Sequence, residues 1–327
     1  MLRWQRTAVP PDNGFRPRKK NGMGTDEGTQ ISELRELIAQ WTTGDGDHQT
    51  AIPSLCVIRY SSSSTSDSGV LSPSLCVCAQ GQGEVVLGAE TYSFAPGHHL
   101  VSSLELPISA RIVGATSAKP CLGLRLCFDP ATIGPLINEA GLTAPPQGPS
   151  ERGLYLAPTP PCLLDAVLRL VRLLGRPAEI PVLAPMIERE ILFRLLLEDS
   201  SAVLHRMAQA ESPPQRIAVA IVWLRKHFRE SFRIDDLARQ AGMSPSSFHQ
   251  WFREITGMSP LQYQKLRRLQ EARILLRRER DDVGTVSRRV GYESSSQFSR
   301  EYTRLFGNPP VQEIGKRISS KANPNSY

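Results

Sequence analysis

The side chains best suited to binding chemistry form two sets of hydrogen-bonding residues, about 50 residues apart. The first set is Ser246, His249, Gln250 and Arg253, and the second is Ser295, Ser296, Ser299 and Arg300. Each set lies on the outward face of a predicted helix, because the apolar residues between its members recur at helical spacing. Hydroxyl, amide and guanidinium groups on an exposed helix are what base edges in a DNA groove require.

A shorter helix and a glycine precede each of these helices, so both copies have the pattern of a helix-turn-helix. In the first copy we expect Asp235 or Asp236 to cap a helix through Ala241, and Gly242 to supply the turn. Ser244 then caps the second helix. The corresponding cap, turn and cap of the second copy are Asp282, Gly291 and Ser294. One copy alone would also fit a plain helical hairpin, but two copies favour DNA binding.

A connector helix is expected between the two copies, from Pro260 to about Glu279. Its roughly 20 residues would span about 30 Å, which is close to the ~34 Å of one turn of B-DNA. We expect Leu269, Ala272, Leu275 and Leu276 to bury against both helix-turn-helix units. A rigid connector of this length would place both second helices in successive major grooves.

Residues 216–310 resemble the DNA-binding domain of AraC/XylS-family transcriptional regulators. The resemblance rests on Gly291-Tyr-Glu-Ser-Ser-Ser-Gln-Phe298 and Phe306-Gly-Asn-Pro-Pro310, whereas Val311–Ile314 departs from the family's usual aromatic-basic pair. It implies a sequence-specific regulator, more often an activator, that binds promoter DNA and contacts RNA polymerase.

The resemblance also implies roles for particular residues. Its base-facing positions fall on Ser246, His249, Gln250, Ser295, Ser296, Ser299 and Arg300. The expected phosphate contacts are Arg253, Arg267, Arg268 and Arg304. Arg300 is the foremost candidate for base recognition, because a guanidinium can bond a guanine edge bidentately. A phosphate contact or a surface ion pair is the alternative for Arg300.

The charge distribution favours a polyanionic partner for the C-terminal part. Residues 213–327 carry 21 Lys and Arg against 11 Asp and Glu, a net +10, which leaves −3 for residues 1–212 in a chain of net charge +7. This asymmetry is typical of nucleic-acid binding. Charge alone would also permit a non-specific DNA-binding protein.

Hydropathy and cysteine usage favour a cytosolic protein. No run of 18 apolar residues occurs, and the first 20 residues lack the apolar segment of a signal peptide. The cysteines are Cys56, Cys76, Cys78, Cys121, Cys127 and Cys162. Their spacing fits neither a zinc site nor a disulfide framework, so we expect reduced thiols.

Residues 52–128 consist of short alternating apolar runs separated by Ser, Gly and Pro, which is typical of β-strands. The expected strands are 55–60, 74–80, 83–87, 90–94, 99–103, 110–115 and 121–128. Such a series indicates a sandwich or barrel. Residues 32–200 resemble the cupin-like N-terminal domain of AraC-type regulators, through the segments Gly81–Gly88, Tyr92–Gly97 and Leu100–Ser103.

Many cupin barrels hold a metal with three histidines and a carboxylate, so a metal-dependent cupin enzyme is the alternative function. His98 and His99 are adjacent here, and neighbours on a strand point to opposite faces. Adding His48, Glu90 or Glu105 would still leave the ligand set incomplete. We therefore expect no metal, no other cofactor and no catalysis.

Cys76 and Cys78 lie two residues apart on one expected strand and so share a face. If this face lines the barrel cavity, the two thiols could sense an electrophilic or oxidising small molecule. The alternative is that both are small buried core residues.

Two strongly apolar helices are expected after the barrel, at Pro161–Leu174 and Pro181–Leu197. Their wide stripes indicate either a hydrophobic partner or burial against their own barrel. Helices at this place support dimers in the AraC/XylS family, so the resemblance implies a homodimer.

These elements define an α+β chain, in which a cupin-like β-barrel with a helical dimerisation segment precedes an all-α domain with two helix-turn-helix units. The expected divisions are a disordered segment at 1–28, a sensing and dimerisation domain at 29–210, a linker at 211–215, a DNA-binding domain at 216–314 and a tail at 315–327.

Overall fold

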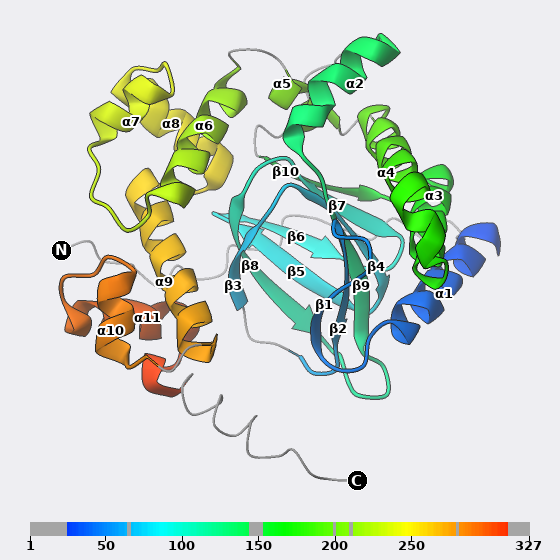
Figure 1. The fold of residues 1–327 in the computed structure, drawn as a ribbon, viewed down its shortest axis with the longest axis horizontal. Coiled ribbons are helices and arrows are strands. Elements are labelled where there is room, and N and C mark those ends of the chain that lie inside the picture. The colour runs from blue at the N-terminus through cyan, green and yellow to red at the C-terminus, as the bar shows by residue number, and fades with distance from the viewer. Residues whose placement is uncertain are drawn as a thin grey trace.

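The computed structural model describes residues 25–63, 67–143, 153–198, 201–208, 212–278 and 281–312. A β domain occupies the first part of the chain, and a helical domain lies beside it (Figure 1). The tail expected at 315–327 and residues 1–24 of the segment expected to be disordered lie outside the described ranges. Residues 25–28 of that segment begin a helix instead.

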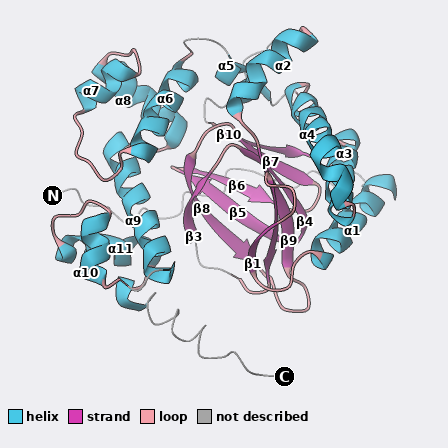
Figure 2. Ribbon diagram, viewed as in Figure 1, coloured by secondary structure: helices cyan, strands magenta, loops and turns pink. Residues whose placement is uncertain are grey.

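The strands of the β domain form two antiparallel sheets (Figure 2). One sheet has the order β1-β2-β9-β4-β7-β10, and the other has the order β3-β8-β5-β6. The strands are β1 (Gly46–Gln49), β2 (Leu55–Tyr60), β3 (Asp67–Leu71), β4 (Ser74–Gln80), β5 (Gln82–Leu87), β6 (Glu90–Phe94), β7 (His98–Ser102), β8 (Leu106–Val113), β9 (Cys121–Cys127) and β10 (Leu154–Pro158). The expected strands are all present, whereas β1, β3 and β10 were not expected.

The two faces of β4 are buried in different surroundings, one in the apolar core and the other in a cavity between the two sheets. Leu75, Val77 and Ala79 point away from the second sheet into the apolar core. Cys76 and Cys78 point the other way, into a cavity lined by strands of both sheets. Because both faces of β4 are covered, its sequence from Leu75 to Ala79 is continuously apolar instead of alternating.

The helices α1 (Thr25–Gln40), α3 (Pro161–Arg172) and α4 (Ile180–Leu196) lie on the outer side of the larger sheet (Figure 1). The helices α2 (Ile133–Ala140) and α5 (Ala202–Ala208) lie at one end of the β domain, between α4 and α6. Most apolar residues of α3 and α4 are buried within the domain, so packing within their own domain covers most of the two wide stripes. Val182 and Met186 remain 66% and 64% exposed on α4. No helix in the described ranges has both the length and the apolar character of a membrane span.

The helical domain contains both helix-turn-helix units. Its helices are α6 (Pro213–Lys226), α7 (Ile234–Gln240), α8 (Pro245–Thr256), α9 (Pro260–Arg278), α10 (Val283–Arg289) and α11 (Ser295–Phe306). Residues 213–215, which were expected to belong to a linker, form the first turn of α6. The Ser212 hydroxyl accepts a hydrogen bond from the backbone of Gln215, and proline suits the first helical position.

The two halves of α9 belong to different apolar clusters. Tyr263 is fully buried in the cluster that joins the first unit to the β domain. Leu269, Ala272, Leu275 and Leu276 pack in a second cluster, with Val286, Phe298 and Tyr302 of the second unit. The expectation that these four residues bury against both units is therefore wrong, because each half of the connector faces only one unit.

Polar contacts also attach the helical domain to the β domain. Arg225 of α6 lies 2.7 Å from the carboxylate of Glu105, which lies between β7 and β8. The Tyr263 hydroxyl donates a hydrogen bond of 3.4 Å to the Glu105 carbonyl oxygen. The loop at Glu105 thus holds both α6 and α9.

Candidate nucleic-acid interface

Side-chain caps begin three of the four helices in the helix-turn-helix units. Ser244 and Ser294 each accept a backbone N–H of the third following residue at 3.3 Å, and Asp282 accepts that of Thr285 at 2.9 Å. These caps agree with the sequence patterns. The exception is α7, whose N-cap is Arg233. Asp235 and Asp236 lie in the first turn of α7, where their negative charge interacts favourably with the helix dipole but neither side chain caps the helix.

Glycines supply both turns. Gly242 has φ of 63° and Gly291 has φ of 89°, a region that side chains with a Cβ rarely adopt. A Cβ at Gly291 would also lie 2.4 Å from the carbonyl oxygen of Arg229. The second turn therefore requires glycine both for its conformation and for a close contact with the chain after α6.

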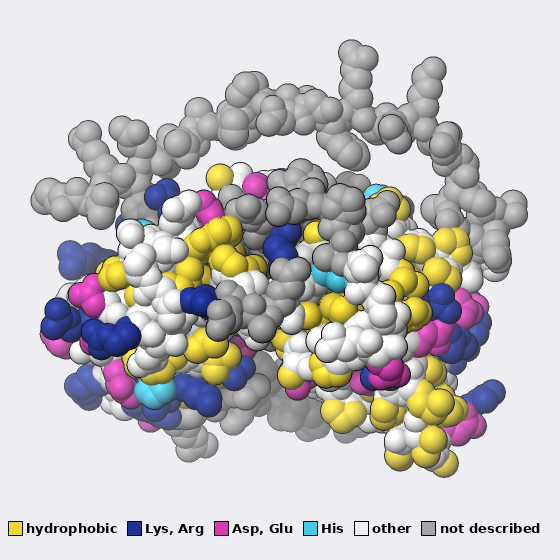
Figure 3. Space-filling view, turned by 90° about the horizontal axis from the view of Figure 1, so that it is seen from above, with side chains coloured by type: hydrophobic (Ala, Val, Ile, Leu, Met, Phe, Trp, Pro, Cys, Tyr) yellow, Lys and Arg dark blue, Asp and Glu magenta, His cyan; other side chains and the backbone are white. Residues whose placement is uncertain are grey.

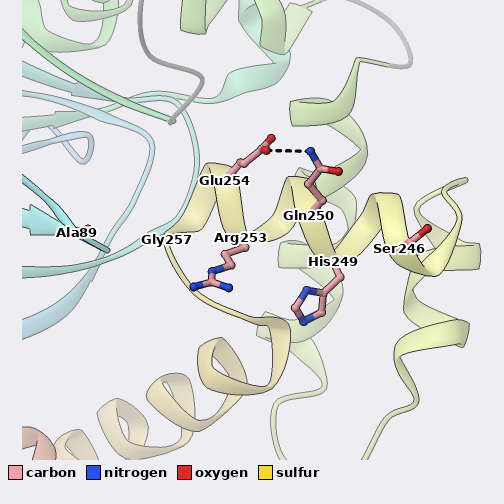
Figure 4. A pocket seen from close by; sticks show the side chains of 7 residues that line it. All are labelled: Ala89, Ser246, His249, Gln250, Arg253, Glu254 and Gly257. Carbon is pink, nitrogen blue, oxygen red and sulfur yellow. Dashed lines mark hydrogen bonds between the residues drawn. The ribbon is translucent and has the colours of Figure 1, made fainter. Parts of the chain in front are cut away.

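The outward face of α8 borders an open crevice of about 700 Å³ (Figure 4). Ser246, His249, Gln250 and Arg253 line it, and Ala89 of the β5–β6 turn lies at its far end. The Gln250 amide donates to Glu254 at 3.0 Å, whereas His249 and Arg253 point to the other side of the helix. Across the described part of the chain, no side-chain partner is found for these two residues, so both are available to a ligand.

The outward face of α11 is similarly open. Ser296 and Arg300 are exposed, and the Arg300 side chain has no hydrogen-bond or ion-pair partner among the described residues. Ser295 differs, because its hydroxyl lies 3.0 Å from that of Ser287 on α10. Ser299, Arg300, Thr303 and Arg304 line a shallow surface crevice. The structure thus brings the second set together on one face, with Ser295 at its inner edge.

The residues expected to contact phosphates fall into two groups. Arg253 and Arg304 are exposed, and Arg267 is half-buried on α9. Arg268 instead donates hydrogen bonds to four backbone carbonyl groups, those of Phe228, Arg229, Glu230 and Gly291. These bonds occupy four of its five N–H groups, which favours a structural role for Arg268 over the expected phosphate contact. Figure 3 shows Lys and Arg side chains gathered on the side of the helical domain.

A half-buried acid holds α11 against the connector. Glu301 accepts hydrogen bonds from Lys265 of α9 at 2.9 Å, from Tyr292 at 2.8 Å and from Gln297 at 3.2 Å. Burial raises the pKa of Glu301, but these three bonds outweigh it and hold the pKa below its usual value. The ionised carboxylate therefore ties the second reading helix to α9 at neutral pH.

The β domain contributes a second candidate site, a cavity of about 350 Å³ between its two sheets. Its walls are mostly apolar, with Asp47, Tyr60, His98, Arg125 and Arg273 as the large polar residues. Arg125 and Asp47 form an ion pair at 2.8 Å. Asp47 lies on β1, which is too short and polar for sequence patterns to reveal, so this pair was not predicted. Arg273 comes from α9 and brings the helical domain to the cavity wall.

The cavity also contains thiols. Cys76 and Cys78 both line it, as their spacing predicted, together with Cys121 of β9. Burial raises the pKa of Cys76 to about 11, and a hydrogen bond with Cys121 together with burial raises that of Cys78. Since the thiolate is the reactive form, these shifts favour thiols that shape the wall over thiols that react quickly at neutral pH.

The two adjacent histidines lie on opposite faces of β7. His98 lines the cavity, whereas His99 is buried on the helical side, with its Nε2 atom 3.1 Å from Glu198. The part of the chain that the structure describes contains no cluster of three or more His, Cys, Asp or Glu residues arranged to hold a metal.

Two helix-turn-helix units on one connector, joined to a two-sheet domain with a ligand-sized cavity, define a two-domain helix-turn-helix protein. Residues 51–203 match the family described as AraC-type transcriptional regulator N-terminus, and residues 237–313 match a helix-turn-helix domain. The chain belongs to the AraC/XylS family of transcriptional regulators.

Individual relatives agree with this assignment. The HTH-type transcriptional activator RhaS of Escherichia coli O1:K1 is 31% identical over 151 residues, which cover 45% of this chain and 53% of RhaS. The chain thus spans about half the length of the curated relatives that it matches. ToxT from Vibrio cholerae O395 shares the fold at 10% identity, with a TM-score of 0.55 over 79% of this chain and 97% of ToxT.

Proposed function

We propose that this chain is a sequence-specific DNA-binding regulator that activates transcription and reads two half-contacts about one DNA turn apart. The observation that carries the proposal is the pair of open reading faces, on α8 and α11, placed on either side of one 19-residue helix. At ~1.5 Å per residue this helix is about 28 Å long, close to the ~34 Å repeat of B-DNA.

Chemistry assigns the contacts within this proposal. The base-facing residues are Ser246, His249, Gln250, Ser295, Ser296, Ser299 and Arg300. Arg253, Arg267 and Arg304 bind phosphates, which position the protein without reading sequence. Activation, with RNA polymerase as a partner, is supported by the similarity to RhaS, which is an activator.

The β domain is proposed to sense a small molecule in its cavity. A volume of about 350 Å³ lies within the range of small-molecule sites. Arg273 of α9 lines the same cavity, so a bound molecule can contact the connector between the two reading helices. This contact is the physical route by which occupancy would alter DNA binding.

Dimerisation is proposed to use the outer face of α4. Val182, Leu183 and Met186 are exposed there, whereas the remaining apolar residues of the helix are mostly buried in the domain. Figure 3 shows further hydrophobic side chains on the side of the molecule away from the helical domain. A second copy of the chain would cover this face from water.

The proposal is tested by selecting duplexes from a random library with the purified full-length protein and footprinting the selected sequence. We expect two protected half-contacts and binding at least about 10³-fold tighter than to random DNA. Inserting roughly five base pairs between the half-contacts rotates one by about half a turn and should weaken binding at least tenfold. Equal affinity for selected and random DNA would refute sequence-specific recognition, and equal affinity for the spaced duplex would refute bipartite reading.

A further inference from the structure

Polar contacts hold the junction between the two helix-turn-helix units. Tyr263 belongs to the apolar cluster of the first unit, and Leu269 begins that of the second. Arg268 lies between them, near the middle of α9. Because the two apolar clusters are separate, the angle between the reading helices α8 and α11 depends on the contacts made by the middle of α9, around Arg268.

Arg268 bonds the connector both to the segment that leads into the first unit and to the turn of the second unit. Its Nε atom donates to the Phe228 carbonyl oxygen at 2.6 Å, and Nη2 donates to those of Arg229 and Glu230, both at 3.1 Å. Its Nη1 atom donates to the Gly291 carbonyl oxygen at 2.8 Å. The first three acceptors lie between α6 and α7, in the segment that leads into the first unit, and the fourth is in the turn of the second unit.

Neighbouring contacts restrict the same point. The Gln264 amide donates to the Glu230 carbonyl oxygen at 2.5 Å. The backbone of Gly291 packs so closely on Arg229 that a Cβ would lie 2.4 Å from its carbonyl oxygen. The chain after α6 is thus held between α9 and the second turn, with little freedom to slide.

The second unit is attached to the same stretch of α9. The Arg268 guanidinium carbon lies 5.9 Å from the centre of the Tyr292 ring, and the Tyr292 hydroxyl donates to Glu301 of α11. Lys265, one helical turn before Arg268, also binds Glu301. Contacts through Tyr292 and Glu301 therefore link this stretch of α9 to the reading helix α11.

We infer that Arg268 is a positioning residue that fixes the orientation of α11 relative to α8, and so sets the spacing of half-contacts that the protein accepts. The inference rests on the proposed bipartite DNA recognition. A guanidinium suits the task because its planar fork presents several N–H groups in fixed directions. Lysine would keep the charge but could not bond four carbonyl groups in this geometry.

The test compares the wild type with Arg268→Lys on three duplexes derived from the selected sequence: the natural spacing, the same site with five inserted base pairs, and a single half-contact. The wild type is measured first. If its affinity ignores the insertion, bipartite recognition itself fails, whatever Arg268 does.

With bipartite recognition established, Arg268→Lys is expected to bind the natural duplex about tenfold more weakly and the single half-contact unchanged. The penalty for the insertion should fall below about threefold. Arg277→Lys, an exposed charge-conserving change on the same helix, should keep the wild-type penalty. An unchanged penalty in Arg268→Lys, or an equal loss on all three duplexes, would overturn the inference.

Gln264→Leu gives an independent measurement if Arg268→Lys fails to fold, as judged by thermal unfolding. This variant removes one bond to the same segment and leaves Arg268 in place. We expect the insertion penalty to fall in the same direction by a smaller factor, about twofold to threefold. A penalty equal to that of the wild type would overturn the inference.

Discussion

Replacing Arg300 by alanine should change which bases the protein prefers without changing its stability. The side chain is exposed on α11 and has no hydrogen-bond or ion-pair partner among the described residues, so its removal breaks no such contact in the folded state. Surface changes of this kind usually alter the free energy of unfolding by less than ~0.5 kcal/mol. The effect should therefore fall almost wholly on DNA binding.

The expected size of the binding effect follows from the chemistry of a guanidinium on guanine. A bidentate contact contributes about 1–3 kcal/mol of discrimination, which is roughly fivefold to 140-fold in affinity at ~1.4 kcal/mol per tenfold. The assay is competition binding at fixed salt against duplexes in which each base pair is changed singly. Arg300→Ala should abolish the preference at one position and leave the others intact.

Arg300→Lys separates base reading from charge. Lysine keeps the positive charge but lacks the planar fork, so it should also lose most of the preference at that position. A phosphate contact would be identified if Arg300→Ala weakened binding equally at every sequence and the slope of log affinity against log salt concentration became shallower by about 0.9. That result would refute base reading by Arg300.

Three further changes test the turn, the cavity and the proposed dimer. Gly291→Ala should lower the free energy of unfolding in urea by about 3 kcal/mol or more, because a clash with the Arg229 backbone adds to the ~1–2 kcal/mol of left-handed strain. Gly307→Ala, at φ of 76° with open space around it, should show the strain alone. Equal losses in the two variants would contradict the close contact between Gly291 and Arg229. Burial raises the pKa of Cys76 to about 11, so the rate at which a maleimide modifies this thiol should rise about tenfold per pH unit between 7 and 10. Cys76 should also react more slowly than the exposed Cys162. A rate that does not depend on pH would contradict the raised pKa. Val182→Glu should shift a dimer towards monomer in sedimentation, because it places a charge in the proposed interface; an unchanged mass would exclude this face of α4.

Local features of the helical domain could be predicted closely from the sequence. Ser244, Ser294 and Asp282 cap the helices that their patterns indicated, since a cap requires only a side chain and a backbone N–H three residues away. Gly242 and Gly291 likewise supply the turns. The prediction that Asp235 or Asp236 caps α7 was wrong, because acidic residues are also favourable in the first turn that follows the cap.

Distant pairings could not be predicted in the same way. Among the described strands, β10 pairs only with β7, and residues 154–158 carry few alternating positions that would reveal the strand. Asp47 meets Arg125 across 78 residues, and neither residue type signals a cavity by itself. The wide stripes of α3 and α4 were ambiguous for the same reason, since periodicity shows that a face is apolar but not what covers it.

The sequence by itself determined the two helix-turn-helix units, their outward polar residues, the basic charge of the C-terminal part and most strands of the β domain. These features follow from hydrogen bonds and periodicities within a few residues of one another. Only the tertiary structure decided that Arg268 bonds to four backbone carbonyl groups, because these acceptors lie 23 to 40 residues away along the chain. It likewise decided that Arg273 of the connector reaches the cavity of the β domain. The sequence gives the charge and the length of an arginine side chain, whereas the fold around it determines which acceptor groups its N–H donors contact.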